Sequence, residues 1–200
     1  EISECLVGSE MCIRDSYCTV FRLHMDPCWT NDPAMKVENE ADISAFNMAR
    51  YRRYLQKLYI PLIKDAIAHG LYVIVRPPGV CPGDISVGDR YNSYLKGIWK
   101  AFAADEYIKQ NEGVISIELA NEPVRVHLSD GTNSERALHD YFQPVVDVIR
   151  EQGFKGIIWV PGAGYQSQYQ DYVKYPITDS EDNFSYACLL YTSPSPRDTR

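Results

Sequence analysis

The chain has 200 residues, of which 45% are hydrophobic, so it is long and apolar enough to bury a core and need not be disordered. The formal net charge of −7, without any Lys- or Arg-rich run, argues against nucleic acid or an anionic membrane as the main partner. No stretch approaches the roughly 20 apolar residues of a membrane span, and we expect a globular protein with a neutral or cationic ligand.

The two ends of the chain differ from its middle. Residues 5–16 (CLVGSEMCIRDS) and 188–200 (CLLYTSPSPRDTR) have no apolar periodicity that joins them to neighbouring elements. Both strings resemble translated sequencing-adapter read-through. We therefore expect non-native tails over residues 1–16 and 188–200 and a natural segment over residues 17–187, with ordinary flexible tails as the alternative.

Short apolar runs alternate with longer amphipathic segments along the natural segment. The apolar runs predict strands at residues 18–25, 71–76, 114–119, 156–160 and 183–187. The amphipathic segments predict helices at residues 42–69, 91–109 and 134–152, the first of them kinked or broken at Pro61. Strands that alternate with helices of this length predict right-handed βαβ units and a parallel sheet.

Two α/β architectures share this order of elements. A doubly wound nucleotide-binding sheet carries a Gly-rich phosphate turn after its first strand, and the sequence has neither G-x-G-x-x-G nor a P-loop. A (β/α)8 barrel places its chemistry in the loops that follow the strands, and here the strands are followed by polar or aromatic clusters. We predict a partial (β/α)8 TIM barrel, because five strands are visible where closure needs eight.

The buried strand at residues 114–119 runs directly into Asn121, Glu122 and Pro123. A strand followed by Asn-Glu-Pro resembles glycoside hydrolase family 5, a cellulase-like family, and the wider clan A of retaining glycosidases. In that family the Glu of this tripeptide is the general acid/base on the fourth barrel strand. The resemblance thus implies catalysis by Glu122.

Two further segments extend the resemblance over nearly all of residues 17–187. The string RLHMDPCW, which begins at Arg22, resembles the second strand of the family, where an Arg lies against the catalytic carboxylates. The string NFSYA at residues 183–187 resembles the sixth strand. The chain is accordingly expected to hold barrel strands 2 to 6.

The resemblance implies a retaining mechanism, in which two carboxyl groups about 5 to 5.5 Å apart act on the anomeric centre. Glu122 would be the acid/base, and Asn121 would hydrogen-bond the sugar 2-hydroxyl. The nucleophile, a Glu on the seventh strand in the family, is absent from the sequence, so we expect the chain to be inactive alone. Asp26 is a rival second carboxylate, although an Asp before Pro27 is more typical of a turn.

Other side chains near the strand ends have assignable roles. Glu118 shares strand parity with Glu122, and we expect it to be a structural carboxylate paired with Arg76 or Arg22. Sugar rings stack on aromatic side chains, so Trp29 and Tyr165 are candidate substrate contacts. His24 is expected to line the cleft, and Trp99 to lie in the core.

The sequence predicts no cofactor and no metal site, because it lacks C-x-x-C and H-x3-H pairs. Cys28 and Cys81 lie in loops of adjacent strands and could form a disulfide. The resemblance favours a monomeric endo-β-glucanase that is secreted, periplasmic or on the cell surface and acts on a β-linked oligo- or polysaccharide. Cellulose, mixed-linkage glucan, xyloglucan and mannan remain open as substrates, because RPPGVCPG lacks the His that many members carry after the third strand. The alternative is a noncatalytic carbohydrate-binding barrel.

Overall fold

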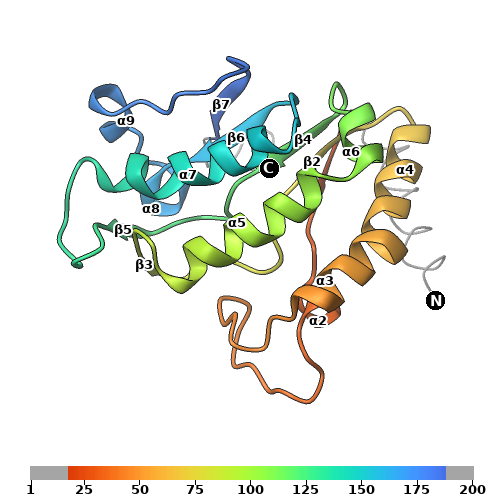
Figure 1. Ribbon diagram of the computed structural model, residues 1–200, viewed down its shortest axis with the longest axis horizontal. Coiled ribbons are helices and arrows are strands. Elements are labelled where there is room, and N and C mark those ends of the chain that lie inside the picture. The colour runs from red at the N-terminus through yellow and green to blue at the C-terminus, as the bar shows by residue number, and fades with distance from the viewer. Residues whose placement is uncertain (1–17, 188–200) are drawn as a thin grey trace, which may run out of the picture.

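The computed structural model describes residues 18–187, and both predicted tails lie outside the described residues (Figure 1). Its main sheet has five strands in the order β1-β2-β4-β6-β7, and every neighbouring pair is parallel. The strands are β1 Val20–Leu23, β2 Tyr72–Val75, β4 Ile115–Glu118, β6 Ile158–Pro161 and β7 Phe184–Ala187. All five predicted strands are therefore present, and the predicted parallel sheet is confirmed.

The helices lie between these strands in the sequence. The longer ones are α3 Met48–Tyr54, α4 Ile60–Ala68, α5 Arg90–Ala103, α6 Glu106–Gln110 and α7 Ala137–Glu151. A π-helical turn, η1 Leu55–Tyr59, joins α3 to α4. Three four-residue segments, α2 Pro27–Thr30, α8 Ala163–Gln166 and α9 Asp171–Lys174, belong to loops that follow β1 and β6.

The helix predicted at residues 42–69 begins later and contains the expected irregularity. Its start was wrong because Asn47 is the N-cap: the Asn47 side chain accepts a hydrogen bond from the Arg50 amide, and the residues before it form turns. Before Pro61 the helix widens into η1, where the Ile60 amide bonds the Leu55 carbonyl. A π-turn next to proline is a recognised cause of helix bending.

The helix predicted at residues 91–109 is two helices, so that expectation was wrong in its continuity. Helix α5 ends at Ala103, and Asp105 is the N-cap of α6, because its carboxylate accepts hydrogen bonds from the Tyr107 and Ile108 amides. An acidic side chain that bonds the backbone two and three residues ahead favours a new N-terminus over helix continuation. The helix predicted at residues 134–152 is confirmed as α7 with a slightly later start.

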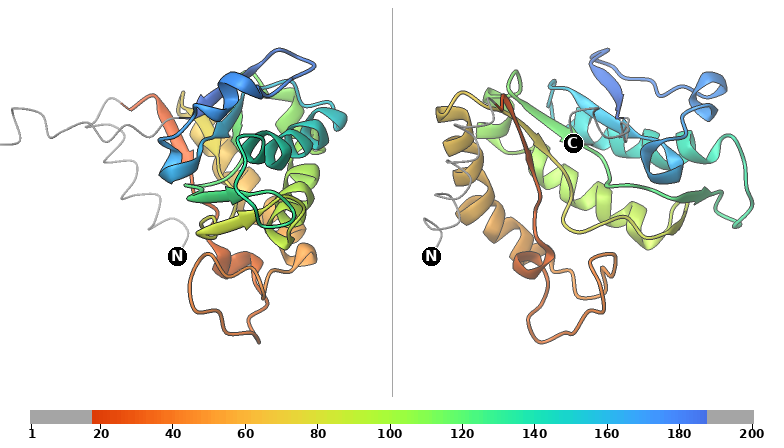
Figure 2. Two further views of the ribbon diagram at one scale, coloured as in Figure 1. Left: turned by 90° about the vertical axis from the view of Figure 1, so that its left-hand side faces the viewer. Right: turned by 180° about the vertical axis from the view of Figure 1, so that it is seen from behind.

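Helices α4, α5 and α7 cover one face of the sheet, and within residues 18–187 no such layer covers the opposite face (Figures 1 and 2). Alternate strand residues divide between the faces. Val73 and Ile117 face the helices and are fully buried, whereas Tyr72 and Val20 on the other face are 54% and 41% exposed. The largest fully buried side chains form the core: Trp99, Tyr51, Tyr59, Tyr141, Phe102, Phe142 and Phe154.

A second sheet, which the sequence did not predict, lies in the loops that follow β2 and β4. It consists of β3 Asp84–Ser86 and β5 Arg125–His127, which pair in parallel. The Arg125 guanidinium donates two hydrogen bonds, of 2.5 and 2.6 Å, to the Asp84 carboxylate. Strands of three residues give too short an alternation to be recognised in a sequence.

At the amino-terminal end of the sheet, an arginine in the last turn of α7 holds the segments that lead into β6 and β7. Arg150 bonds both carboxylate oxygens of Asp179, at 2.6 and 2.7 Å. It also donates to the carbonyls of Phe154, Gly156 and Asn183.

Among the described residues, no helix has the length and apolar character needed to cross a membrane.

Candidate active site

The candidate active site is built where β1, β2 and β4 end. Parallel strands bring their carboxyl ends to one edge of a sheet, and loops carry the residues that follow. Here β1 contributes Arg22, β4 contributes Glu118, and Arg76 directly follows β2. In the parallel pairing of β1 with β2, Arg22 lies opposite Ile74, and Ile74 is two residues before Arg76.

The first contact of the site is an ion pair across the sheet. Arg22 donates from Nε and Nη2 to the two carboxylate oxygens of Glu118, at 2.7 and 2.6 Å. The Glu118 side chain is only 5% exposed, and that of Arg22 is 35% exposed. These hydrogen bonds raise the pKa of Arg22 although its partial burial acts to lower it. The structural pairing expected for Glu118 is therefore found, and its partner is Arg22.

The second contact orients Asn121. Its side chain is buried, and its Oδ1 accepts from Arg22 Nη2 at 2.9 Å and from Arg76 Nη1. Because both guanidinium groups hold the oxygen, the amide nitrogen points away from them. Burial, followed by the charge of Arg22, lowers the pKa of Arg76. The positively charged side chains of Arg22 and Arg76 thus fix the orientation of the Asn121 amide.

Glu122 adjoins this network without entering it. Its backbone is left-handed, with φ of 55°, a conformation that non-glycine residues seldom adopt. Its side chain is partly buried, and no hydrogen bond or ion pair engages its carboxylate within residues 18–187. After the hydrogen bonds and charge of Glu118, the negative charge of Glu122 also acts to raise the pKa of Arg22. The carboxylate lies near the arginines and is available to a ligand.

The sequence reasoning missed one residue of this group, Gln166. Its side chain is fully buried, and its Nε2 donates to Glu118 Oε1 at 3.0 Å and to the Ala120 carbonyl at 3.3 Å. It belongs to α8, which is not a regular helix because Gly164, Tyr165 and Gln166 all have left-handed φ angles. The closely spaced glycines of PGAGYQ were the signal that could have indicated an unusual turn.

The other predicted substrate contacts lie further from this group. Trp29 stacks against Tyr54 of α3, with ring centroids 5.2 Å apart. His24 Nε2 lies 3.6 Å from the Glu40 carboxylate, and burial together with the charge of Arg76 lowers the pKa of His24. Tyr165 is 58% exposed. The structure thus joins Arg22 to Asn121 by a hydrogen bond and places Glu122 next along the chain.

The remaining candidates have local roles. Asp26, the rival carboxylate, caps α2 by accepting a hydrogen bond of 2.8 Å from the Cys28 amide. Cys28 and Cys81 are both free thiols, so the possible disulfide between them is not formed. Across residues 18–187, no cluster of His, Cys, Asp and Glu side chains is arranged to hold a metal ion.

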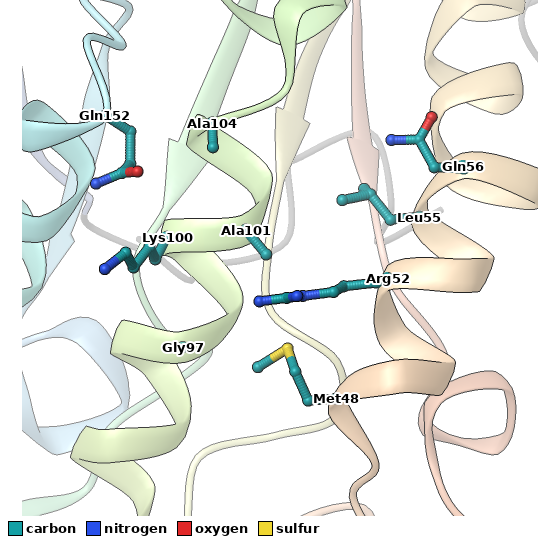
Figure 3. Close-up of a pocket in the computed structure, with 9 residues that line it drawn as sticks. All are labelled: Met48, Arg52, Leu55, Gln56, Gly97, Lys100, Ala101, Ala104 and Gln152. Atoms are coloured by element: carbon teal, nitrogen blue, oxygen red, sulfur yellow. The ribbon is translucent and has the colours of Figure 1, made fainter.

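Two pockets lie apart from the Arg22–Glu118–Asn121 contacts. One, of about 460 Å³, is a groove of the helical layer into which Arg52 extends from α3 and Lys100 from α5 (Figure 3). The other, of about 410 Å³, is formed by the loop after β1, between Asp26 and Glu40. Neither pocket is lined by a side chain of the strand-end group. The strand ends, and not these pockets, therefore carry the candidate chemistry.

The parallel sheet, its helical layer and the acid and amide after β4 define part of a (β/α)8 barrel. The family model for cellulase (glycosyl hydrolase family 5) matches residues 13–197. The chain belongs to this family. No curated protein sequence is significantly similar to it.

Solved structures of this family share the fold. A thermostable, halotolerant GH5 cellulase from an Icelandic hot spring isolate is 24% identical with a TM-score of 0.58, over 88% of this chain and 46% of its own. The catalytic domain of Thermobifida fusca endoglucanase Cel5A is 23% identical with a TM-score of 0.57, over 88% and 50%. XacCel5A, solved with cellopentaose, is 17% identical with a TM-score of 0.52, over 68% and 44%. This chain spans half or less of the length of each.

Proposed function

We propose that the full-length gene product is a retaining glycoside hydrolase that cleaves a β-linked polysaccharide in the manner of an endo-β-glucanase. Membership of the cellulase family supports the reaction class. The observation that carries the proposal is the pairing of two neighbours after β4: an amide fixed by two arginines, and a carboxylate that no described side chain engages. A substrate-binding amide and a proton-transferring acid need these two environments.

In the proposed mechanism, Glu122 gives its proton to the glycosidic oxygen as the bond to the leaving sugar breaks. It then removes a proton from the water that releases the second product. The amide nitrogen of Asn121 faces away from Arg22 and Arg76 and donates to the sugar 2-hydroxyl, a contact that strengthens in the transition state. The arginines therefore act on the substrate through the amide.

The nucleophile is the part of the mechanism that this chain does not supply. Glu118 is not a candidate because its side chain is only 5% exposed and is bonded by Gln166 as well as by Arg22, and Asp26 is not one because it caps α2. We infer that the second carboxylate belongs to another part of the full-length protein and that these 200 residues alone do not hydrolyse glycosides.

The proposal extends to substrate and setting. XacCel5A was solved with cellopentaose, and a β-linked glucan is the ligand we propose for this protein. Trp29, Tyr165 and His24 are proposed to contact the glucan as it extends away from Glu122. A polymeric substrate is outside the cell, so we propose a secreted, periplasmic or surface-bound monomer.

The test is to recover the full gene, express it and measure reducing sugar released from cellulose, mixed-linkage glucan, xyloglucan and mannan. The variant Glu122→Gln is expected to lower kcat/KM on polysaccharide by about 100-fold or more. It should lose much less activity on aryl glycosides with acidic leaving groups, because these depart without protonation.

The matched control is Glu106→Gln, which removes a carboxylate that is 77% exposed on α6. It should leave activity unchanged. Undiminished activity of Glu122→Gln on polysaccharide would remove the acid/base assignment. A full-length protein that binds glucans and hydrolyses none of them would support the noncatalytic carbohydrate-binding barrel instead.

A further inference from the structure

We propose that the left-handed turn Gly164–Gln166 is a clamp that fixes the position of Glu122, with Gln166 as its positioning residue. This inference rests on the proposed role of Glu122 in proton transfer. The turn follows β6, whereas Glu122 follows the neighbouring strand β4. Two loops that are distant in the sequence thereby meet at the candidate active site.

Four hydrogen bonds join the turn to the β4 segment, and they lie on both sides of Glu122 in the sequence. After Glu122, the Tyr165 amide donates to the Pro123 carbonyl and the Gly164 amide donates to the Val124 carbonyl, each at 2.9 Å. Before it, the Gln166 side chain donates to the Ala120 carbonyl and to Glu118, as described above.

The turn Gly164–Gln166 adopts backbone angles that are unfavourable for residues with a side chain. Consecutive left-handed residues cost about 1–2 kcal/mol each for residues with a Cβ, and the φ angles of Tyr165 and Gln166 are 57° and 60°. A Cβ at Gly164 would lie 2.7 Å from Gln168 Cδ, so the exposed Gln168 side chain would have to shift. The buried Gln166 Oε1 has no hydrogen-bond partner among the described residues. Strain and an unsatisfied buried oxygen in one turn indicate a geometry that serves a site.

The position of Glu122 depends on its backbone because nothing described holds its carboxylate. Its own φ is 55°, so the chain turns sharply there, and the carbonyls that the clamp grips set the direction of the side chain. A catalytic acid misplaced by about 1 Å can lose about 100-fold in rate. Gln166 therefore acts on the reaction through Glu122, without touching the substrate.

The first test measures hydrogen exchange of the Gly164 and Tyr165 amides in the 200-residue chain, which needs no activity. The variant Gln166→Leu keeps the volume and removes both side-chain donors. It is expected to speed hydrogen exchange at these amides by about tenfold, because two of the four hydrogen bonds that hold the turn are lost. The matched control is Gln170→Glu, an exposed position four residues on, which should leave these rates unchanged.

The second test uses Gln166→Glu, which has nearly the same shape. Its carboxyl can donate to Glu118 only while it holds a proton. Exchange, corrected for its intrinsic dependence on pH, should be fast at neutral pH and slow again as the pH is lowered. Protection that is the same at every pH would overturn the proposal. This arm also decides the question if Gln166→Leu fails to fold.

In the full-length protein, Gln166→Glu is expected to lower kcat by about tenfold or more near neutral pH, with KM within twofold of the wild-type value. A change in KM alone would contradict a positioning role. If the wild-type protein has no activity while the exchange results hold, the proposed function fails and the clamp stands. If activity is present but exchange at Gly164 and Tyr165 does not respond to Gln166→Leu, the clamp fails and the function stands.

Discussion

Two arginine–carboxylate pairs tie this molecule together at opposite ends of its sheet, and they are built differently. At the amino-terminal end, Arg150 and Asp179 have side chains that are 6% and 0% exposed. Arg150 uses Nε, Nη1 and Nη2 in hydrogen bonds to that carboxylate and to three backbone carbonyls. This pair is closed to solvent, and each nitrogen of its guanidinium is bonded.

At the carboxyl end, Arg22 is 35% exposed beside Glu118. The buried Nε of Arg76 has no hydrogen-bond partner among the described residues, and the Glu122 carboxylate is likewise unengaged there. In barrels of parallel strands, the amino-terminal face serves stability and the carboxyl-terminal face serves chemistry. A closed ion pair marks the first face, and an incompletely satisfied network marks the second.

The largest effect is expected from breaking the closed pair. Asp179→Ala leaves a buried guanidinium without its carboxylate, which costs about 3–5 kcal/mol of unfolding free energy. Urea denaturation followed by circular dichroism measures the change. Asp147→Ala, at an exposed position on α7, is the matched control and should stay within about 0.5 kcal/mol. A loss below about 1 kcal/mol for Asp179→Ala would show that this pair is not closed in solution.

Neutralising Glu118 in the Arg22–Glu118 pair should lower stability less, and activity more, than Asp179→Ala does. Glu118→Gln retains an acceptor for Arg22 and loses the charge, so we expect a loss of about 1–2 kcal/mol, the difference between charged and neutral hydrogen bonds. Activity of the full-length protein should fall by about tenfold or more, since Arg22 also orients Asn121. Glu106→Gln is again the control. A stability loss as large as that of Asp179→Ala would erase the contrast between the two ends.

Removing Arg76 should affect activity and leave stability nearly unchanged. Arg76→Met deletes a buried nitrogen without a partner, and its long side chain fills similar space, so the free energy of unfolding should change by less than about 1 kcal/mol. Asn121 loses one of its two donors, and kcat in the full-length protein should fall. Arg52→Met, in the groove between α3 and α5, should alter neither quantity. An unchanged kcat for Arg76→Met would restrict the orienting role to Arg22.

The smallest effect is a difference in pH response. Burial and the charge of Arg76 lower the pKa of His24, so its stabilising contribution is complete above pH of about 6.5 and is lost below it. Burial acts to raise the pKa of Asp179, yet Arg150 lowers it overall, so its contribution is lost only below pH of about 3.9. Unfolding measured from pH 8 to 3 should show both steps. The upper step should vanish in His24→Gln. The lower step should shrink in Asp179→Asn without vanishing, because the pKa values of Asp26, Asp42, Asp84 and Asp130 are lowered as well. An unchanged step in either variant would contradict its assignment.

The order of the elements could be predicted from the sequence because strand periodicity is local. The run from Leu71 to Arg76 is apolar on both faces, which is typical of a covered parallel strand, and β2 lies within it. Element boundaries depended on single side chains. Asn47 and Asp105 begin helices by capping them, and a periodic apolar pattern continues across such positions without showing the break.

Part of the candidate site follows from the sequence. The Asn-Glu-Pro string led to the prediction of Asn121 and Glu122 as site residues, and strand parity predicted Glu118 to be an inward carboxylate. The choice between Arg22 and Arg76 as its partner depends on register and on the length of the side chains, which a sequence does not contain. Gln166 was missed because its role comes from a turn in which three residues adopt positive φ angles.

At position 122, the residue that the backbone conformation favours differs from the residue that the proposed site requires. A glycine would adopt a φ of 55° without steric cost, whereas glutamate pays about 1 kcal/mol or more there. Glu122→Gly is therefore expected to preserve or raise thermal stability while deleting the carboxylate. A sequence optimised for stability alone would select glycine at this position, so a redesign of this chain for robustness would tend to discard its proposed acid.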